Sequence, residues 1–503
     1  MKQSAAPPTQ PTPTAAPDAP QVFRRIARLL DDAGICYCHW KSNYHIQHAL
    51  AGDEDFDLLV ARSDFRAFAR LLYEQGFRPA STPSSRSQPG VFHFLGVDTD
   101  GRLLNVHSYT RILTGDHLLK SYGLPFETML LENRRLEQGV YVPTKTAETI
   151  VFTFRLALKV VRPIDRKLVR RSRKLIAEEF AWLMAGLDRT QLAELMTRHF
   201  PGIEPKLVLD IVDALAAGTD PLDLGALARR LALPLARFYR YGALGRAWRS
   251  VVGLAQIAWN RLAKERHMEL DEGGVVLAVV GPHASGKSTV CGHIRQWLGR
   301  ELGVRYVHVG KPPSTLLTWL PNRLIPLMRR VRPDAVTHRG DQQANEDPSA
   351  QLGWLYIVRK LMLAIERRKL LRDVFRRSRN GRIVLCDRYP ADDAGTVDSA
   401  SFTDEVIAAQ RSNLKQRAMR WETAIYRDLP APDIVVELTV SLDEAIQRNL
   451  GRDKPGQDTE YLRRRGKLAH EYRFRRAQVV RVPGGMTEAE TLAFVRREVW
   501  SRL

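Results

Sequence analysis

Cysteine is scarce in this chain. The four cysteines, Cys36, Cys38, Cys291 and Cys386, are too few for a disulfide scaffold, and none has the Cys-x-x-Cys spacing of a zinc site. We therefore expect a reducing, cytoplasmic setting. Long apolar runs are also missing, because no stretch reaches the roughly 18 uncharged apolar residues of a membrane span. The N-terminal residues contain no apolar signal-peptide core, so neither export nor a transmembrane segment is predicted.

Acidic residues are outnumbered by basic ones. The 503 residues include 77 Lys and Arg against 56 Asp and Glu, which gives a net charge of +21. This excess favours anionic partners such as nucleotides, nucleic acid, phosphorylated metabolites or a membrane surface, and an arginine-rich genome would produce it as well. With 44% hydrophobic and 26% charged residues, the composition excludes a wholly disordered, collagenous or coiled-coil protein.

The sequence pattern divides the chain into four segments, in keeping with a length that allows about three domains. Residues 1–20 form a Pro/Thr/Ala-rich tail that we expect to be disordered. Residues 21–145 have a mixed α/β pattern, residues 146–268 are helical, and residues 269–503 alternate strands with helices. The last segment has five apolar runs, at 275–280, 305–309, 382–387, 433–440 and 478–482. The predicted class is α/β, with a five-stranded parallel sheet covered on both faces in the last segment.

A phosphate-binding loop follows the first of these runs. The residues from Gly281 to Ser288 fit the pattern G-x-x-x-x-G-K-[ST], and a helix-like segment comes directly after them. Glycines let backbone N–H groups surround a phosphate, while Lys287 is expected to reach the β- and γ-phosphates and Ser288 to ligate Mg²⁺. The predicted ATP-binding residues are Gly281, Pro282, His283, Ala284, Ser285, Gly286, Lys287, Ser288 and Thr289.

A second polar pair, Asp387 and Arg388, stands at the end of the run at 382–387. Ligands bind beyond the carboxyl ends of strands in open parallel sheets, so this pair is expected beside the phosphate loop. Asp387 is predicted to hold Mg²⁺ or its water, and Arg388 to grip a phosphate of the acceptor.

Together these motifs make residues 273–503 similar to the thymidylate kinase family. The resemblance rests on GPHASGKST, CDRYP, PDIVVELTVSLDEAIQRN and RDKPGQDTEYLRRRGKLAHEYR. It implies a mobile lid whose arginines, here Arg448 and Arg452, close over the phosphates and act with Lys287, Asp387 and Arg388 in catalysis. It also implies that Arg367 or Arg368 contacts the acceptor, as Arg388 does. His283 replaces the usual acidic residue of that loop, and ADDAGTVDSASF differs from the usual segment after CDRYP. These two departures favour an acceptor other than dTMP.

Paired carboxylates mark the N-terminal segment. Asp55 and Asp57 stand two apart on a predicted strand, so they share one face and can hold Mg²⁺. With the turn at residues 39–43, they make residues 21–145 similar to the nucleotidyltransferase superfamily. Lys41 and Ser42 stand where those enzymes usually have Gly-Ser. The next suitable strand offers Asn105 and His107 instead of a third carboxylate, and His107 is expected to be structural.

Two basic runs lie outside these motifs. Residues 155–174 contain nine Lys and Arg with one Asp, and residues 367–382 contain eight with one Asp. Such helices can be solvated faces, or can track a polyanion or an anionic membrane. No aromatic interleaving or recognised nucleic-acid module accompanies the charges, so base stacking is not predicted. Contact with nucleic acid or an anionic membrane is not the favoured interpretation.

The sequence therefore predicts an ATP- and Mg²⁺-dependent phosphotransferase of the thymidylate-kinase-like type, fused to a nucleotidyltransferase-like module. Its expected partner is a small phosphate acceptor, either a nucleotide or a sugar phosphate. Two alternatives are open: a nucleotide-responsive regulatory protein that binds a polyanion or a membrane, and an NMP transferase that acts through Asp55 and Asp57. The oligomeric state is not set by the sequence, and a dimer is compatible with it.

Overall fold

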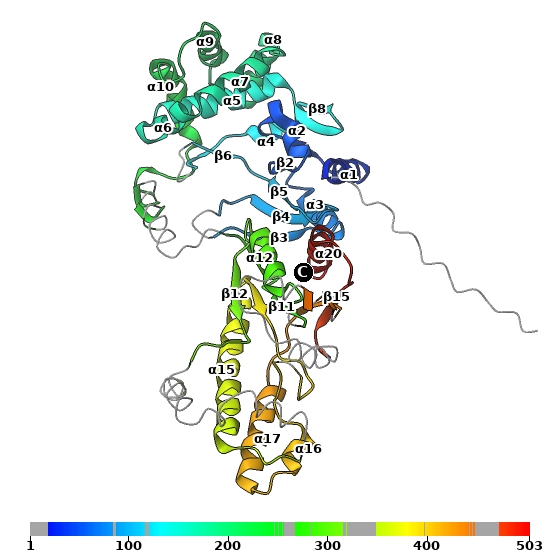
Figure 1. Cartoon of the computed structure of the whole chain (residues 1–503). Coiled ribbons are helices and arrows are strands. Elements are labelled where there is room, and N and C mark those ends of the chain that lie inside the picture. Colours follow the sequence, from blue (N-terminus) through cyan, green and yellow to red (C-terminus); the bar gives the residue numbers. More distant parts are fainter. Residues whose placement is uncertain are drawn as a thin grey trace, which may run out of the picture. The chain divides into compact units, whose positions relative to one another are not determined.

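The chain divides into two compact units, Met1–Arg266 and His267–Leu503 (Figure 1). The computed structural model describes residues 19–503 except 84–86, 116–119, 246, 250, 254, 256–266, 283, 315–317, 319–348, 397, 442, 445 and 448–471. Each unit is considered by itself. Among the described residues, no helix combines the length and the apolar character that crossing a membrane requires.

The first unit begins with a mixed sheet. Its strands β1 (Tyr37–His39), β2 (Phe56–Val60), β5 (Leu103–Tyr109), β4 (Val91–Val97) and β3 (Arg78–Ser81) lie side by side in that order. β2 and β5 are parallel, and the other neighbours are antiparallel. All five residues of β2 are buried, which is expected of a strand covered on both faces. Helices α1 (Ala19–Asp32), α2 (Ile46–Leu50) and α3 (Phe65–Glu74) accompany this sheet.

Short elements lead from the sheet to a helical layer. They are β6 (Leu113–Thr114), β7 (Tyr122–Gly123), α4 (Phe126–Glu132), β8 (Arg134–Glu137) and β9 (Val140–Pro143). The layer consists of α5 (Lys145–Val160), α6 (Pro163–Arg171), α7 (Arg173–Met184), α8 (Arg189–His199), α9 (Pro205–Ala216) and α10 (Gly225–Leu235). α5 is buried along nearly its whole length, which is typical of a helix surrounded by others. Cys38 and Trp40 share one apolar cluster with residues of this layer, so the sheet and the helices of the first unit have a common core.

The second unit contains the five predicted strands as one parallel sheet, in the order β12 (Val304–His308), β13 (Ile383–Asp387), β11 (Val276–Val280), β14 (Ile434–Leu438) and β15 (Gln478–Val482). A two-residue strand, β10 (Glu269–Leu270), precedes them. β11 and β13 are fully buried, as the run of apolar residues in each predicts.

Helices cover this sheet and carry parts of the site. α12 (Lys287–Leu298), α15 (Trp354–Ser378), α16 (Asp404–Ala408), α17 (Asn413–Arg427) and α20 (Glu488–Trp500) are the described helices with assigned bounds. Val276, Ala278 and Val280 pack in the same cluster as Leu371 and Val374 of α15. Side chains alternate along a strand, so the intervening residues of β11 face the opposite layer. The loops at the carboxyl ends of β11 and β13 therefore lie at one edge of a sheet that is packed from both sides.

Candidate active site

The phosphate loop joins β11 to α12 and requires glycine at two positions. Gly281 has a φ of 150°, and a Cβ there would lie 2.6 Å from the carbonyl oxygen of Leu438. Gly286, just before α12, has a φ of 86°, a left-handed conformation that glycine adopts at little cost. The loop thereby ends at a helix N-terminus, where the first N–H groups have no intrahelical partner and the helix dipole favours an anion.

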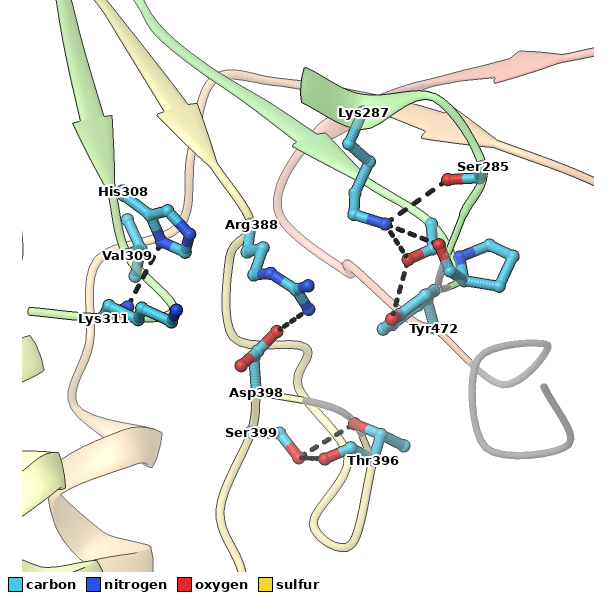
Figure 2. A network of polar contacts seen from close by, with 12 residues as sticks. Ser285, Lys287, His308, Val309, Lys311, Arg388, Thr396, Asp398, Ser399 and Tyr472 are labelled. Atoms are coloured by element: carbon cyan, nitrogen blue, oxygen red, sulfur yellow. Dashed lines mark hydrogen bonds and ion pairs between the residues drawn. The ribbon is translucent and has the colours of Figure 1, made fainter. Parts of the chain in front are cut away.

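Lys287 is the first residue of α12 and folds back over the loop (Figure 2). Its ammonium donates to the carbonyl oxygens of Gly281, at 3.1 Å, and of Pro282, and to the hydroxyl of Ser285 at 3.4 Å. Burial, followed by the charge of nearby Arg388, lowers the pKa of Lys287 to about 8. Because its partners are neutral oxygens, this buried cation would gain from the arrival of an anionic phosphate.

Asp387 stands at the end of β13, next to the phosphate loop. β11 and β13 are paired in parallel with Val279 opposite Asp387. The carboxylate is buried, and its Oδ2 accepts a hydrogen bond of 2.8 Å from the hydroxyl of Tyr306 on β12. Ser288, the other predicted metal ligand of this unit, is exposed in the first turn of α12. A carboxylate and a hydroxyl are oxygen donors of the kind that Mg²⁺ prefers, so this donor set fits the predicted ion.

Asp398 joins two arginines of the second unit. Its Oδ2 accepts from Arg388 at 3.0 Å, and its Oδ1 accepts from Arg367 of α15, also at 3.0 Å (Figure 2 shows the first contact). Arg367 also donates to the backbone oxygen of Asp398 at 2.8 Å and to the hydroxyl of Tyr426 at 2.7 Å. The side chain of Arg388 is 24% exposed, whereas that of Arg367 is 4% exposed. Arg388 is therefore the guanidinium that a ligand can reach, and Arg367 is used in holding Asp398.

The two adjacent arginines of α15 have different surroundings. Arg367 points into the buried network, while Arg368 makes an exposed ion pair of 3.1 Å with Asp428 at the end of α17. Neither arrangement presents a guanidinium to the phosphate loop. Direct contact of Arg367 or Arg368 with the acceptor stays a prediction from the family resemblance.

The remaining predicted site residues of this unit fall into two groups. Ala284 has a positive φ of 62° and is buried in the loop, and Thr289 is exposed in the first turn of α12. His283, Arg448 and Arg452 lie outside the described residues, so their predicted roles stay predictions.

Three polar residues of this site were not predicted from the sequence. Asp398 bridges the two arginines, Tyr306 binds Asp387, and the hydroxyl of Tyr472 donates to the carbonyl oxygen of Gly281 at 3.5 Å. Asp398 lies in the segment after CDRYP, and the only signal for it was the difference of that segment from the family pattern. Its positive φ of 67° lies in a region where Asp is one of the better tolerated residues.

A buried carboxyl group, Glu422 of α17, is expected to make the stability of the second unit depend on pH. Its Oε1 accepts from the backbone N–H of Ser401 at 3.0 Å, and burial raises its pKa to about 7. A raised pKa means that the folded state binds the proton more tightly. The stability from this group is therefore present below the ordinary pKa and is lost as the pH rises through about 7. We expect Glu422→Gln to remove about 2 kcal/mol of the change in unfolding free energy between about pH 5 and pH 8.

Urea unfolding at a series of pH values measures this effect. Glu405→Gln, at an exposed position of α16, is the matched control and should leave the pH dependence as in the wild type. Parallel curves for wild type and Glu422→Gln would contradict the assignment.

In the first unit, three polar side chains form a row across neighbouring strands. Asp57 of β2 lies opposite His107 of β5, which lies opposite His93 of β4. Asp57 Oδ1 is 3.0 Å from His107 Nδ1, and the two imidazoles stack with their centroids 4.2 Å apart. Tyr109, two residues beyond His107 on the same face, donates its hydroxyl to Asp57 Oδ1 at 3.0 Å.

The other oxygen of Asp57 is also engaged. Its Oδ2 lies 3.2 Å from the ammonium of Lys41, and these partners hold the pKa of Asp57 below its usual range, against the opposing effect of burial. Asp55 accepts from Asn105 at 3.0 Å and is 3.9 Å from His107. Within the described part of the chain, no group of three His, Cys, Asp or Glu side chains is placed to hold a metal ion. The predicted ligands Asp55 and Asp57 are thus near each other, but Asp57 is neutralised by protein groups.

Comparisons with known proteins give structural matches only. No protein-family model matches the chain, and no curated protein matches it. Among solved structures, a thymidylate kinase from Candida albicans is 20% identical, with a TM-score of 0.28 over 45% of this chain and 90% of that one. A deoxyadenosine kinase from M. mycoides with dCMP and dCDP is 16% identical, with a TM-score of 0.25 over 44% of this chain and 98% of that one. The same enzyme with dATP is 14% identical, with a TM-score of 0.26 over 45% and 98%.

Proposed function

We propose that the second unit is an ATP- and Mg²⁺-dependent phosphotransferase of the nucleoside monophosphate kinase type, with an acceptor other than dTMP. The observation that carries the proposal is the meeting of Lys287, Asp387 and Arg388 at one edge of the parallel sheet. A glycine loop and a helix N-terminus at the same edge supply backbone donors for phosphate oxygens. Phosphoryl transfer needs little more from a protein than such positioning and charge stabilisation.

Each residue has a distinct part in this proposal. The ammonium of Lys287 leaves the loop carbonyls for the β- and γ-phosphates of ATP. Arg388, held in place by Asp398, grips the phosphate of the acceptor. An acceptor oxygen then forms a bond to the γ-phosphorus as the bond to the β-phosphate oxygen breaks, releasing ADP. Ser288 and Asp387 are the residues that would hold Mg²⁺, which when bound neutralises charge on the phosphates.

Turnover with a panel of acceptors tests the proposal. The full chain is incubated with ATP, Mg²⁺ and either a nucleoside monophosphate or a sugar phosphate, and the formation of ADP is measured. We expect one class of acceptor to raise the rate well above that of ATP hydrolysis. If no acceptor is phosphorylated and Lys287→Ala leaves ATP binding unchanged, the kinase assignment is wrong.

Nucleotidyl transfer by the first unit has less support in the geometry. Two-metal chemistry needs carboxylates that can bind metal ions, and both oxygens of Asp57 already have protein partners. The ammonium of Lys41 supplies next to Asp57 the positive charge that a metal ion would otherwise bring. If nucleotidyl transfer is found, Asp55 and Asp57 are the candidate metal ligands.

Polyanion binding by the run 367–382 is also weakened by ion pairs. Four of its arginines face carboxylates, in the pairs Arg367–Asp398, Arg368–Asp428, Arg377–Asp373 and Arg382–Glu269. These pairs reduce the charge available to a phosphate backbone. A cytoplasmic location stays part of the proposal, because four cysteines are too few for a disulfide scaffold.

A further inference from the structure

A cavity of about 320 Å³ opens in the first unit, next to the row formed by Asp57, His107 and His93. Four cationic side chains line it: Lys41, Lys120, Arg155 and Lys159. Asp165 is the carboxylate on the lining. The volume is at the lower end of the range for small-molecule sites, so the cavity suits a compact ligand rather than a segment of polymer.

The cations that line this cavity lie close enough to repel one another. Burial, followed by the nearby charges of Arg155 and Lys120, lowers the pKa of Lys159 to about 8, against weaker opposing effects of Glu179 and Asp165. Arg155 also lies over the ring of Trp40, 5.6 Å from its centroid. Like charges gathered in a partly buried cavity destabilise the fold unless an anion joins them.

Two buried polar atoms on the lining residues have no partner among the described residues. They are Nε1 of Trp40, whose residue is 6% exposed, and Oδ2 of Asp165, whose residue is 1% exposed. Buried polar atoms in folded proteins nearly always have a hydrogen-bond partner, so each of these is a place where a ligand can supply one. An indole N–H can donate to a hydroxyl oxygen, and a carboxylate can accept from a hydroxyl group.

We propose that this cavity is a binding site for a small phosphorylated polyhydroxy compound, such as a phosphosugar. Arg155, Lys159 and Lys120 hold the phosphate of the ligand, and Trp40 and Asp165 bind the hydroxyl groups of its sugar. Lys41, anchored by Asp57 at 3.2 Å, adds a fixed positive charge. The site uses no residue of the phosphate loop, so it makes the first unit a binding module independent of phosphotransfer in the second.

Isothermal titration of the full chain tests this proposal, with glucose 6-phosphate and ribose 5-phosphate as probes. We expect saturable binding of a phosphosugar and none of glucose. Lys159→Gln should weaken binding by about ten- to a hundredfold, because it removes a charge-assisted hydrogen bond. Arg171→Gln, an exposed position at the end of α6, removes the same charge away from the cavity and should leave the affinity unchanged.

Three outcomes would overturn the proposal. In the first, Lys159→Gln and Arg171→Gln bind alike. In the second, Lys287→Ala abolishes the binding, which would place the probe at the phosphate loop instead. In the third, inorganic phosphate or a long polyanion binds as tightly as the phosphosugars, which would remove the roles of Trp40 and Asp165. The titration needs no turnover, so its failure and that of the kinase assignment are separate results.

Thermal unfolding without ligand provides an independent measurement. Replacing Lys159 by glutamine removes a half-buried cation from a cluster of cations, so the variant should unfold at the wild-type temperature or higher. A large decrease would mean that Lys159 is needed for the fold and would contradict its assignment to a ligand. Addition of a phosphosugar should raise the unfolding temperature of the wild type and have a smaller effect on Lys159→Gln.

Discussion

Replacing Lys287 by alanine is expected to lower phosphate transfer from ATP by about 10²–10³-fold. The ammonium is buried in the phosphate loop, bonded to the carbonyl oxygens of Gly281 and Pro282, and its burial lowers its pKa to about 8. A preorganised charge of this kind stabilises charge that develops in the transition state without further reorganisation. The rate constant for transfer, measured at saturating ATP with the best acceptor of the panel, is the quantity to compare.

A cation farther along the same helix provides the control. Arg295 is exposed on α12, and Arg295→Ala removes one positive charge without touching the loop. We expect its transfer rate to stay within about twofold of the wild type, since exposed charges contribute little. Equal losses in the two variants would mean that net charge on α12, and not the position of the Lys287 ammonium, controls the reaction.

The strand, glycine loop and helix from β11 to α12 could be predicted because these parts are contiguous. A strand, two glycines, a lysine and a helix follow one another within a few residues, and each position has a local physical reason. The neighbouring position of Asp387 followed from a general property of parallel sheets. The same property does not identify Tyr306, which reaches Asp387 because β12 and β13 pair in a particular register.

Contacts that depend on an irregular loop or on the register between strands could not be predicted. Asp398 meets Arg367 from a different element, 31 residues away in the sequence, and its position depends on an irregular loop. In the first unit, Asp55 and Asp57 were predicted as metal ligands from their spacing, together with the turn at residues 39–43. Their neighbours depend on the pairing of β2, β5 and β4, which puts His107 against Asp57. Spacing within one strand indicates which side chains lie on the same face of the sheet. The register between neighbouring strands decides which residues those side chains contact.

Truncation of the buried Arg367 is expected to destabilise the second unit by about 3–5 kcal/mol. The side chain of Arg367 is 4% exposed. Its guanidinium donates to two oxygens of Asp398, the carboxylate Oδ1 and the backbone carbonyl. Its loss removes these contacts with Asp398 and the bond to Tyr426. Breaking one side of a buried ionic network is costly because desolvated charge and donors are left without compensation.

Arg368 provides a matched control for Arg367, because it is the next residue on the same helix and has the same side chain. Its ion pair with Asp428 is exposed, so Arg368→Ala should cost less than about 1 kcal/mol. Hydrogen exchange of the backbone amides of α15 and α17, measured in the full chain, reports the loss locally and separates the two units. We expect much faster exchange in Arg367→Ala and nearly wild-type exchange in Arg368→Ala. Similar protection in both variants would show that Arg367 does not anchor the network, and the position of Arg388 would then need another explanation.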